Sequence, residues 1–338
     1  IALVLKSLID DKNVNLNFKE LQNTILSFPY KYNDKQSKLC KLHKKFYLKK
    51  TVGGNASIHW NLIRLLPLMI GHLISSENKA WQLLLLLKDI VELSFAPTIS
   101  TDMVAYLKMQ IETHHKMFID VFPNVNMKVK HHYITHYPQL IIQFGPLIQF
   151  WCMRFEAKHA FIKRTVSKSK NFKNPLKFVA DKHCKLMFFH LGNPDFFNTS
   201  NLIAIKSKLN HCTSIDAVTL QLLQEVQYCT VYQSCSAVTV IGIKYERGLV
   251  VILPMEMKPL HFGLVVDIWL MKNSIYFECN LQKSEYNDHR RCYELVSTNE
   301  IKIVSLHKLG DPHPLPVYSI QGNRYVVQKH AVLPLMVF

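Results

Sequence analysis

The hydrophobic pattern of this chain changes once along its length, and that change constrains the fold more than any other feature. Up to about residue 200, apolar side chains recur three or four residues apart, as at Ile58, Leu62 and Leu65, which is typical of amphipathic helices. From about residue 236, short runs rich in β-branched and aromatic residues alternate with turn residues, which is typical of antiparallel strands. The pattern predicts an α+β fold, with a mainly helical N-terminal region followed by a small, barrel-like antiparallel β domain.

Helix-capping and helix-breaking residues set the expected ends of the helices. Ser75 and Ser76 can cap one helix, and Ser100 or Thr101 the next, because their side chains accept hydrogen bonds from the first free N–H groups. Pro67 is expected to kink the helix in which it lies, since proline has no N–H to donate. The predicted helices cover 58–73, 77–95, 102–121, 132–144 and 151–166.

The same pattern divides the chain into three segments. The helical region is expected over residues 1–195 and the β domain over 236–338. Residues 196–235 carry neither pattern throughout and are interpreted as a linker with one helix, at 214–227. A chain of 338 residues is long enough for two such domains.

Positive charge is concentrated in the first of these segments. Residues 1–200 hold 28 Lys and Arg against 13 Asp and Glu, whereas residues 201–338 hold 13 against 11. Basic proteins bind polyanions because they release counterions from phosphate groups. The imbalance favours a nucleic-acid partner for the helical region, although solubility alone is the simpler explanation of the same charge.

Several classes of protein are disfavoured by the sequence. The apolar run at 83–87 is too short to cross a bilayer, so no membrane association is expected. The eight cysteines include no CxxC pair, which favours a reducing compartment over a disulfide framework. The chain contains no GxxxxGK[ST], GxGxxG or GxSxG motif, so a phosphate-binding loop and a serine-hydrolase elbow are unsupported.

One carboxylate, Glu156, stands within the basic segment WCMRFEAKHAFIKR. Residues 128–185 contain 12 Lys and Arg, but only Glu156 and Asp181 as acidic residues. Positive neighbours favour the ionised form of a carboxyl group, which suits a Mg²⁺ ligand. An ordinary ion pair on a solvated helix fits these residues equally well, so the segment alone leaves both interpretations open.

A second group of residues has the spacing of metal ligands. His132 and His136 are four residues apart and therefore lie on one helix face, as Zn²⁺ ligation requires. Cys40 and His43 offer a further pair upstream. Histidines are abundant, with 17 in the chain, so packed or surface histidines explain the same spacing.

One part of the chain resembles a known family. The stretch HHYITHYPQLIIQFGPLIQFWCMRFEAKHAFIKR, followed by NFKN, resembles the C-terminal part of CACTA/EnSpm-type DDE transposases of animal genomes. LIRLLPLMIG and AYLKMQIETHHKMF are similar to segments of the same family. The resemblance covers roughly residues 1–190 and is most specific at 131–174.

The resemblance implies a fold and a set of metal ligands. The family's catalytic core is RNase H-like, and in it two Asp and a late Glu hold two Mg²⁺ ions, with a helical insertion between the second Asp and the Glu. Residues 15–145 would be mostly that insertion, and Glu156 would be the catalytic third acid. Related families bind structural Zn²⁺ within the insertion, and the matching residues here are Cys40, His43, His131 and His136.

The resemblance also implies a function. The chain is expected to be a transposase-derived DNA-binding fragment, ancestrally cleaving and transferring DNA strands in the nucleus. Both catalytic Asp are expected to be missing, so whether it is an enzyme stays open, and strand cleavage by the chain as given is not expected. The alternative is a domesticated, non-enzymatic DNA- or protein-interaction module whose β domain binds a protein partner. The expected DNA contacts are Arg154, Lys158, Lys163, Arg164, Lys168, Lys170 and Lys173.

Overall fold

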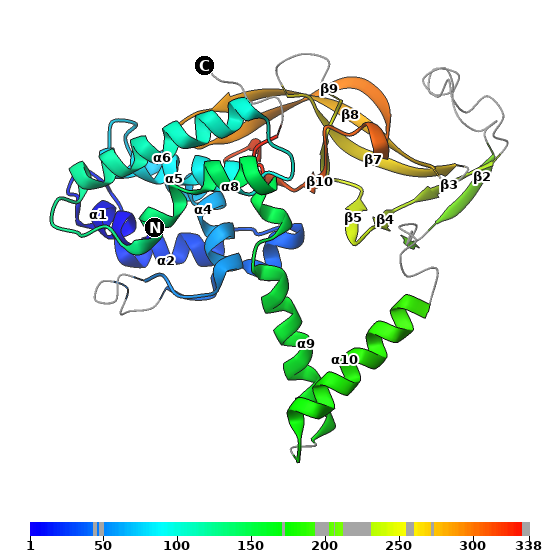
Figure 1. Ribbon diagram of the computed structural model, residues 1–338. Coiled ribbons are helices and arrows are strands. Elements are labelled where there is room, and N and C mark those ends of the chain that lie inside the picture. The colour runs from blue at the N-terminus through cyan, green and yellow to red at the C-terminus, as the bar shows by residue number, and fades with distance from the viewer. Residues whose placement is uncertain are drawn as a thin grey trace.

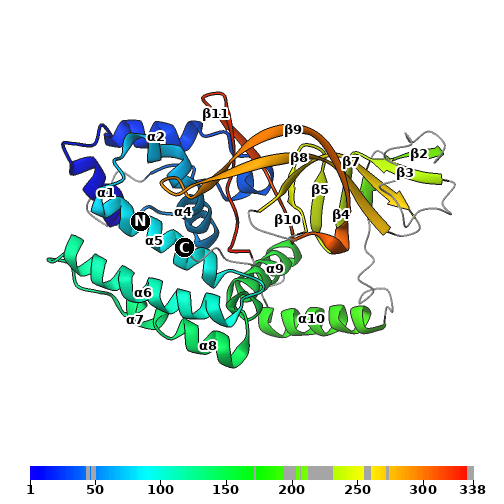
Figure 2. The same cartoon turned by 90° about the horizontal axis from the view of Figure 1, so that it is seen from above.

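The computed structural model contains a helical region followed by antiparallel sheets, shown from two directions in Figures 1 and 2. This arrangement confirms the α+β prediction. The structure describes residues 1–42, 46, 51–170, 173–192, 203–205, 207–211, 231–254, 260–271 and 274–332, with the backbone alone described at 154–157, 211 and 231.

The helices agree with the periodicity of the sequence. All five predicted helices are present, the fourth as two shorter ones, and further helices precede and follow them. The α-helices are α1 (Ala2–Asp10), α2 (Phe18–Ser27), α4 (Ala56–Ile70), α5 (Lys79–Ser94), α6 (Thr101–Val121), α7 (Val129–Ile134), α8 (Tyr137–Phe144), α9 (Met153–Ser169) and α10 (Pro175–Gly192). The 3₁₀-helices are η1 (Tyr32–Ser37), η2 (Gly71–Leu73), η3 (Leu147–Gln149) and η7 (Leu306–Lys308).

Side-chain caps fix the start of α2, α4, α5 and α6. Ser100 accepts a hydrogen bond from the Met103 N–H (3.3 Å), which confirms its predicted cap of α6. The cap of α5 is Asn78, whose Oδ1 accepts from the Trp81 N–H at 3.0 Å, rather than Ser75 or Ser76. The Ser75 hydroxyl instead accepts from the Glu77 N–H in the turn before the helix.

The strands form two open antiparallel sheets. Among the described strands, nine form one sheet with the order β10-β6-β7-β8-β9-β12-β11, and β3 and β2 continue from the edge of β7. Three more form the order β1-β4-β5. The strands are β1 (Ile203–Ile205), β2 (Lys208–His211), β3 (Val231–Cys235), β4 (Ala237–Val240), β5 (Ile243–Glu246), β6 (Val250–Ile252), β7 (Phe262–Met271), β8 (Ser274–Asn287), β9 (Cys292–Ser305), β10 (Asp311–Leu315), β11 (Val317–Ile320) and β12 (Asn323–Val326).

Two details of the β region differ from the sequence prediction. The described strands do not close into a barrel, because β10 and β11, at the two ends of the strand order, do not pair with each other. Strands β6 and β3 pair in succession with the same edge of β7. The predicted linker at 196–235 contributes β1, β2 and β3 to the sheets. Its predicted helix at 214–227 lies outside the described residues.

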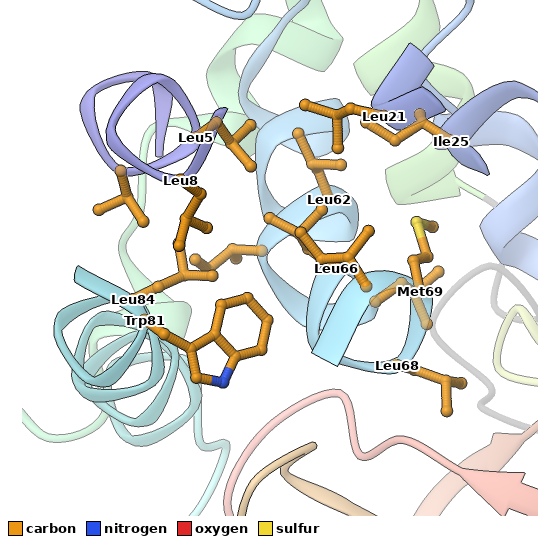
Figure 3. Close-up of a cluster of buried hydrophobic side chains, with 14 of the residues drawn as sticks. Leu5, Leu8, Leu21, Ile25, Leu62, Leu66, Leu68, Met69, Trp81 and Leu84 are labelled. Atoms are coloured by element: carbon orange, nitrogen blue, oxygen red, sulfur yellow. The ribbon is translucent and has the colours of Figure 1, made fainter. Parts of the chain in front are cut away.

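The helical region and the C-terminal strands share a hydrophobic core. Figure 3 shows its helical part, in which Leu8 of α1, Leu66 of α4 and Trp81 of α5 point toward one another. The same cluster includes Cys292 at the start of β9 and Tyr318 of β11. The predicted segments therefore differ in secondary structure but bury side chains together; their boundaries stay a prediction.

The turn between β8 and β9 is bound to the helices by polar contacts. Nε2 of His289 donates to the carbonyl oxygens of Gly71 (2.8 Å) and Ile74 (2.9 Å), and Arg291 forms an ion pair with Asp89 of α5 at 3.1 Å. A Cβ at Gly71 would lie 3.2 Å from Arg290 and 3.3 Å from Trp81. Glycine therefore allows the turn to lie close to the helices.

A buried ion pair connects η1, α4 and β11. The two terminal nitrogens of Arg64 donate to the two carboxylate oxygens of Asp34 at 3.1 and 2.9 Å, and the Tyr318 hydroxyl donates to the same carboxylate at 2.6 Å. Burial acts to raise the pKa of Asp34, but the Arg64 charge and these hydrogen bonds lower it below its ordinary 3.8 overall. The carboxylate is therefore ionised in the folded chain at neutral pH.

Replacing Arg64 by Met should destabilise the chain strongly. We expect a loss of about 3–5 kcal/mol in the free energy of unfolding, because the Asp34 charge would stay buried without its partner. Urea denaturation followed by circular dichroism measures the change. The matched control is Arg247→Met, which breaks the more exposed pair with Asp267 and should cost about 1 kcal/mol or less. Equal losses in the two variants would show that the buried Arg64–Asp34 pair matters no more for stability than an exposed ion pair.

Candidate functional site

Helices α9 and α10 form a hairpin that extends from the rest of the chain (Figure 1). Helix α9 ends at Ser169, and the C-cap residue Lys170 adopts a left-handed backbone conformation with φ of 50°. Helix α10 begins after Asn174, whose Oδ1 accepts from the Lys177 N–H at 3.1 Å. No described residue of α9 or α10 is buried, so the hairpin lies at the surface and its residues are exposed or partly exposed.

The exposed surface of this hairpin is basic. The segment 153–192 contains ten Lys and Arg against the two acidic residues Glu156 and Asp181. Lys158 is half-buried, and its ammonium lies 5.0 Å from the centroid of the Phe161 ring. The predicted DNA contacts whose side chains are exposed are Lys163, Arg164, Lys168, Lys170 and Lys173.

The side chains of Arg154 and Glu156 lie outside the described part of the structure. The backbone places both residues in the first turns of α9, as the sequence predicted. The role of Glu156 as a metal ligand and that of Arg154 as a DNA contact therefore stay predictions.

Aromatic packing fixes the base of the hairpin. The Trp151 ring lies 5.1 Å from Phe95 and 6.2 Å from Trp60, measured between ring centroids, and both contacts are edge-on. Trp60 belongs to α4, and Phe95 follows α5. Such pairs stabilise by about 0.5–1.5 kcal/mol beyond the area they bury. The start of α9 is thus held by the same helices that carry the buried core.

The predicted zinc ligands do not come together in the described part of the chain. Cys40 is exposed, and His43 lies outside the described residues. His131 packs against Phe118, 4.7 Å between centroids, whereas His136 approaches His132, with their Nε2 atoms 3.2 Å apart. The four-residue spacing therefore does place two imidazoles together, but it is His132 that pairs with His136.

A buried histidine stands beside His131. His114 of α6 is 4% exposed, and its ring stacks on that of His131 at 6.4 Å. Burial lowers the pKa of His114 to about 4, with smaller contributions from its neighbours His115 and His131. Its Nδ1 has no hydrogen-bond partner among the described residues. The imidazole is therefore neutral at physiological pH and acts as part of the core.

A different set of ligand-type residues converges at the start of β10. Asp311, His313 and His330 offer one carboxylate oxygen and two ring nitrogens that all lie within 4.8 Å of one another. This is the only group of three or more such ligand atoms among the residues that the structure describes. We refer to these three residues as the β10 triad.

Local backbone geometry assembles the β10 triad. Asp311 pairs with Ile252 of β6, and the preceding Gly310 lies so close to that strand that a Cβ would be 2.8 Å from the Leu253 carbonyl oxygen. Asp311 and His313 are two residues apart on a strand, which places both side chains on one face. His330 follows β12 and is fixed by the next residue, since the Ala331 N–H donates to the Glu92 carbonyl of α5 at 3.0 Å.

Hydrogen bonds in the β10 triad keep its carboxylate charged. Asp311 Oδ1 accepts from the backbone N–H of His313 (2.6 Å) and from its Nδ1 (3.0 Å), and Oδ2 accepts from Nε2 of His330. Burial acts to raise the pKa of Asp311, but these hydrogen bonds hold it well below its ordinary range. Asp311 and His330 are buried, whereas the His313 side chain is 36% exposed. One side of the group therefore faces solvent.

The sequence prediction missed the β10 triad. The Asp-x-His spacing at 311–313 was the available signal, but the sequence analysis predicted no strand at that position. His330 is brought beside it by the β11–β12 hairpin, whose register the sequence does not specify.

Comparisons of this chain with models of protein families, with curated proteins and with solved structures find no match. The transposase resemblance therefore rests on the motif residues alone. Within the described residues, none of the helices has both the length and the apolar character that crossing a membrane requires.

The contribution of His114 to the stability of the chain should fall as the pH drops from about 6.5 to 4. Below pH 6.5 the unfolded chain protonates His114, whereas the folded chain resists protonation down to a pKa of about 4. This difference is worth on the order of 3 kcal/mol. In His114→Leu, urea denaturation at several pH values should show a much smaller loss over this range. The exposed control His159→Leu should show the same pH dependence of stability as the parent chain. If His114→Leu also showed it, His114 would not be its source.

Proposed function

We propose that this chain binds DNA through the basic surface of the α9–α10 hairpin. The observation that carries the proposal is the exposure of Lys163, Arg164, Lys168 and Lys170 on a hairpin with ten basic and two acidic residues. The motif resemblance to CACTA/EnSpm-type transposases supports the same function independently.

The electrostatics of the hairpin favour a polyanion. Like charges on neighbouring helices repel one another, and at about 0.15 M salt the repulsion extends over roughly 8 Å. A phosphate backbone relieves that repulsion and releases its own counterions when it binds. Lysine and arginine contacts to phosphate give affinity without reading the base sequence. The expected binding is therefore strong at low salt and independent of sequence.

The same surface would ancestrally have been part of a transposase active site. Glu156 lies in α9, and in the transposase interpretation α9 is the last helix of an RNase H-like core. Its carboxylate would be the third acidic ligand of the Mg²⁺ ions, at a place where a DNA backbone must approach. Basic neighbours then serve both to keep this group ionised and to bind the substrate. Nuclear localisation belongs to the same proposal.

Exposed apolar residues support a second candidate, a protein-binding module. Leu176, Phe188 and Phe189 of α10 are 84%, 81% and 64% exposed, and Leu191 is also exposed. Large apolar side chains gathered on one exposed helix are typical of interaction sites. A partner would cover this part of the hairpin, in addition to or instead of the β region that the sequence analysis considered.

The triple variant Lys163→Gln, Arg164→Gln, Lys168→Gln tests DNA binding. Fluorescence anisotropy with a labelled duplex should show weaker binding, and log K should fall less steeply with log salt, by about 0.9 for each phosphate that the variant no longer neutralises. The matched control is Lys31→Gln, Lys35→Gln, Lys38→Gln, which removes the same charge from the surface of the helical body and should keep the slope of the parent chain.

Two results would overturn the DNA proposal. One is an affinity that does not change between about 50 and 200 mM salt, since phosphate contacts always give such dependence. The other is an equal loss in the hairpin variant and its control. If Phe188→Ser, Phe189→Ser alone abolished binding of a protein partner while DNA affinity stayed negligible, the second candidate would hold.

A further inference from the structure

The β10 triad lies outside the basic hairpin and has no part in the proposed DNA binding. It combines a carboxylate with two imidazoles, which is a donor set that binds Zn²⁺ and related divalent transition metals. Its members come from two places in the chain, β10 and the segment after β12. A bound ion would therefore add a second link between two segments that the His330–Asp311 hydrogen bond already joins.

The distances within the β10 triad suit a tetrahedral ion. Zn²⁺ bonds of about 2.0–2.2 Å place neighbouring tetrahedral ligands about 3.3 Å apart. The Asp311 Oδ1 to His313 Nδ1 distance is 3.0 Å, and no pair of the three ligand atoms is more than 4.8 Å apart. The two imidazole rings are nearly perpendicular, at 85°, with centroids 5.3 Å apart. Shifts within the range of side-chain rotation bring the three atoms to tetrahedral positions.

Two of the three candidate ligands are buried and the third is partly exposed. A metal site needs both ordered ligands and a path for the ion from solvent. Asp311 and His330 are fixed and buried, so most of their orientation is set before an ion binds. His313 reaches solvent, which provides an entry path and a position for a water molecule as the fourth ligand. The peptide between Asp311 and His313 is itself held, because the Tyr245 hydroxyl donates to the Pro312 carbonyl at 2.5 Å.

We propose that Asp311, His313 and His330 bind one Zn²⁺ ion, with water as the fourth ligand; the ion replaces the ring protons that His313 Nδ1 and His330 Nε2 donate to Asp311, and the other nitrogen of each neutral imidazole then carries the proton. The ion joins β10 to the segment that follows β12, which in turn is hydrogen-bonded to α5 through Ala331 and Glu92. Its role is to stabilise the contact between the C-terminal segment and the helical region. The donor set disfavours Mg²⁺, which prefers oxygen ligands in an octahedral arrangement.

Zinc titration of the full chain tests this proposal. The parent for the experiment carries His132→Ala and His136→Ala, because that pair of imidazoles, 3.2 Å apart, can bind Zn²⁺ by itself. Isothermal titration calorimetry with ZnCl₂ should give one ion per chain, and MgCl₂ should give no heat of binding. Titration with Co²⁺ should give the intense visible absorption of a four-coordinate site.

Removing one ligand should weaken binding selectively. We expect His313→Ala to lose at least about tenfold in Zn²⁺ affinity, since even loss of an outer-shell partner costs that much. His307→Ala, which removes an exposed histidine of η7, is the matched control and should bind as the parent does. Because the His313 side chain is partly exposed, this variant keeps the test valid even if His330→Ala fails to fold, which circular dichroism will show.

Three outcomes would overturn the proposal. The first is no Zn²⁺ binding by the parent, which would leave the β10 triad as a hydrogen-bonded cluster only. The second is unchanged affinity in His313→Ala. The third is an equal loss in His307→Ala, which would assign the zinc to a different histidine. None of these results depends on whether the α9–α10 hairpin binds DNA.

Discussion

The buried ion pair between Arg64 and Asp34 is the interaction on which the arrangement of the helical region and the sheet depends. Arg64 is 3% exposed. A guanidinium group stays protonated, so it cannot avoid the cost of a buried charge by becoming neutral. Its charge is compensated mainly by Asp34, which η1 brings to α4, and the Tyr318 hydroxyl from β11 donates a hydrogen bond to the same carboxylate. The C-terminal strands are therefore part of the helical core, because without them this polar group would lack one of its donors.

That constraint also positions both candidate sites. Helix α4 carries Trp60, which with Phe95 packs on Trp151 and sets the starting point of α9. Strand β11 follows β10 directly, so fixing Tyr318 also fixes the strand that begins at Asp311. The hairpin and the β10 triad are thus attached to one rigid centre from opposite parts of the sequence.

Local signals in the sequence were sufficient to predict the helices, but not to predict which residues come together in the candidate sites. Helical periodicity and capping residues such as Ser100 predicted the helices to within a few residues, because these signals act over one or two turns. The four-residue spacing predicted that His132 and His136 lie together, and they do. His131, which the family resemblance implied as a ligand, packs against Phe118 instead, because five residues on a helix correspond to about 140° of rotation; its role as a zinc ligand stays a prediction. The β10 triad depends on the register of β10 against β6 and on the β11–β12 hairpin. Those are long-range pairings that no local pattern specifies.

Charged residues are paired in the core but mostly of one sign on the α9–α10 hairpin. Substitutions therefore have different effects in the two places. In the core, the charges of Arg64, Asp34 and Asp311 are each matched by partners on other elements, so altering one leaves another buried and uncompensated. The hairpin segment contains ten basic and two acidic residues, and none of its described side chains is buried, so altering one exposed charge there reduces repulsion between like charges. Substitutions in the hairpin can therefore change its surface charge while the fold persists, whereas substitutions in the core act on stability first. A chain built in this way can keep its fold while the charge of its exposed basic surface changes.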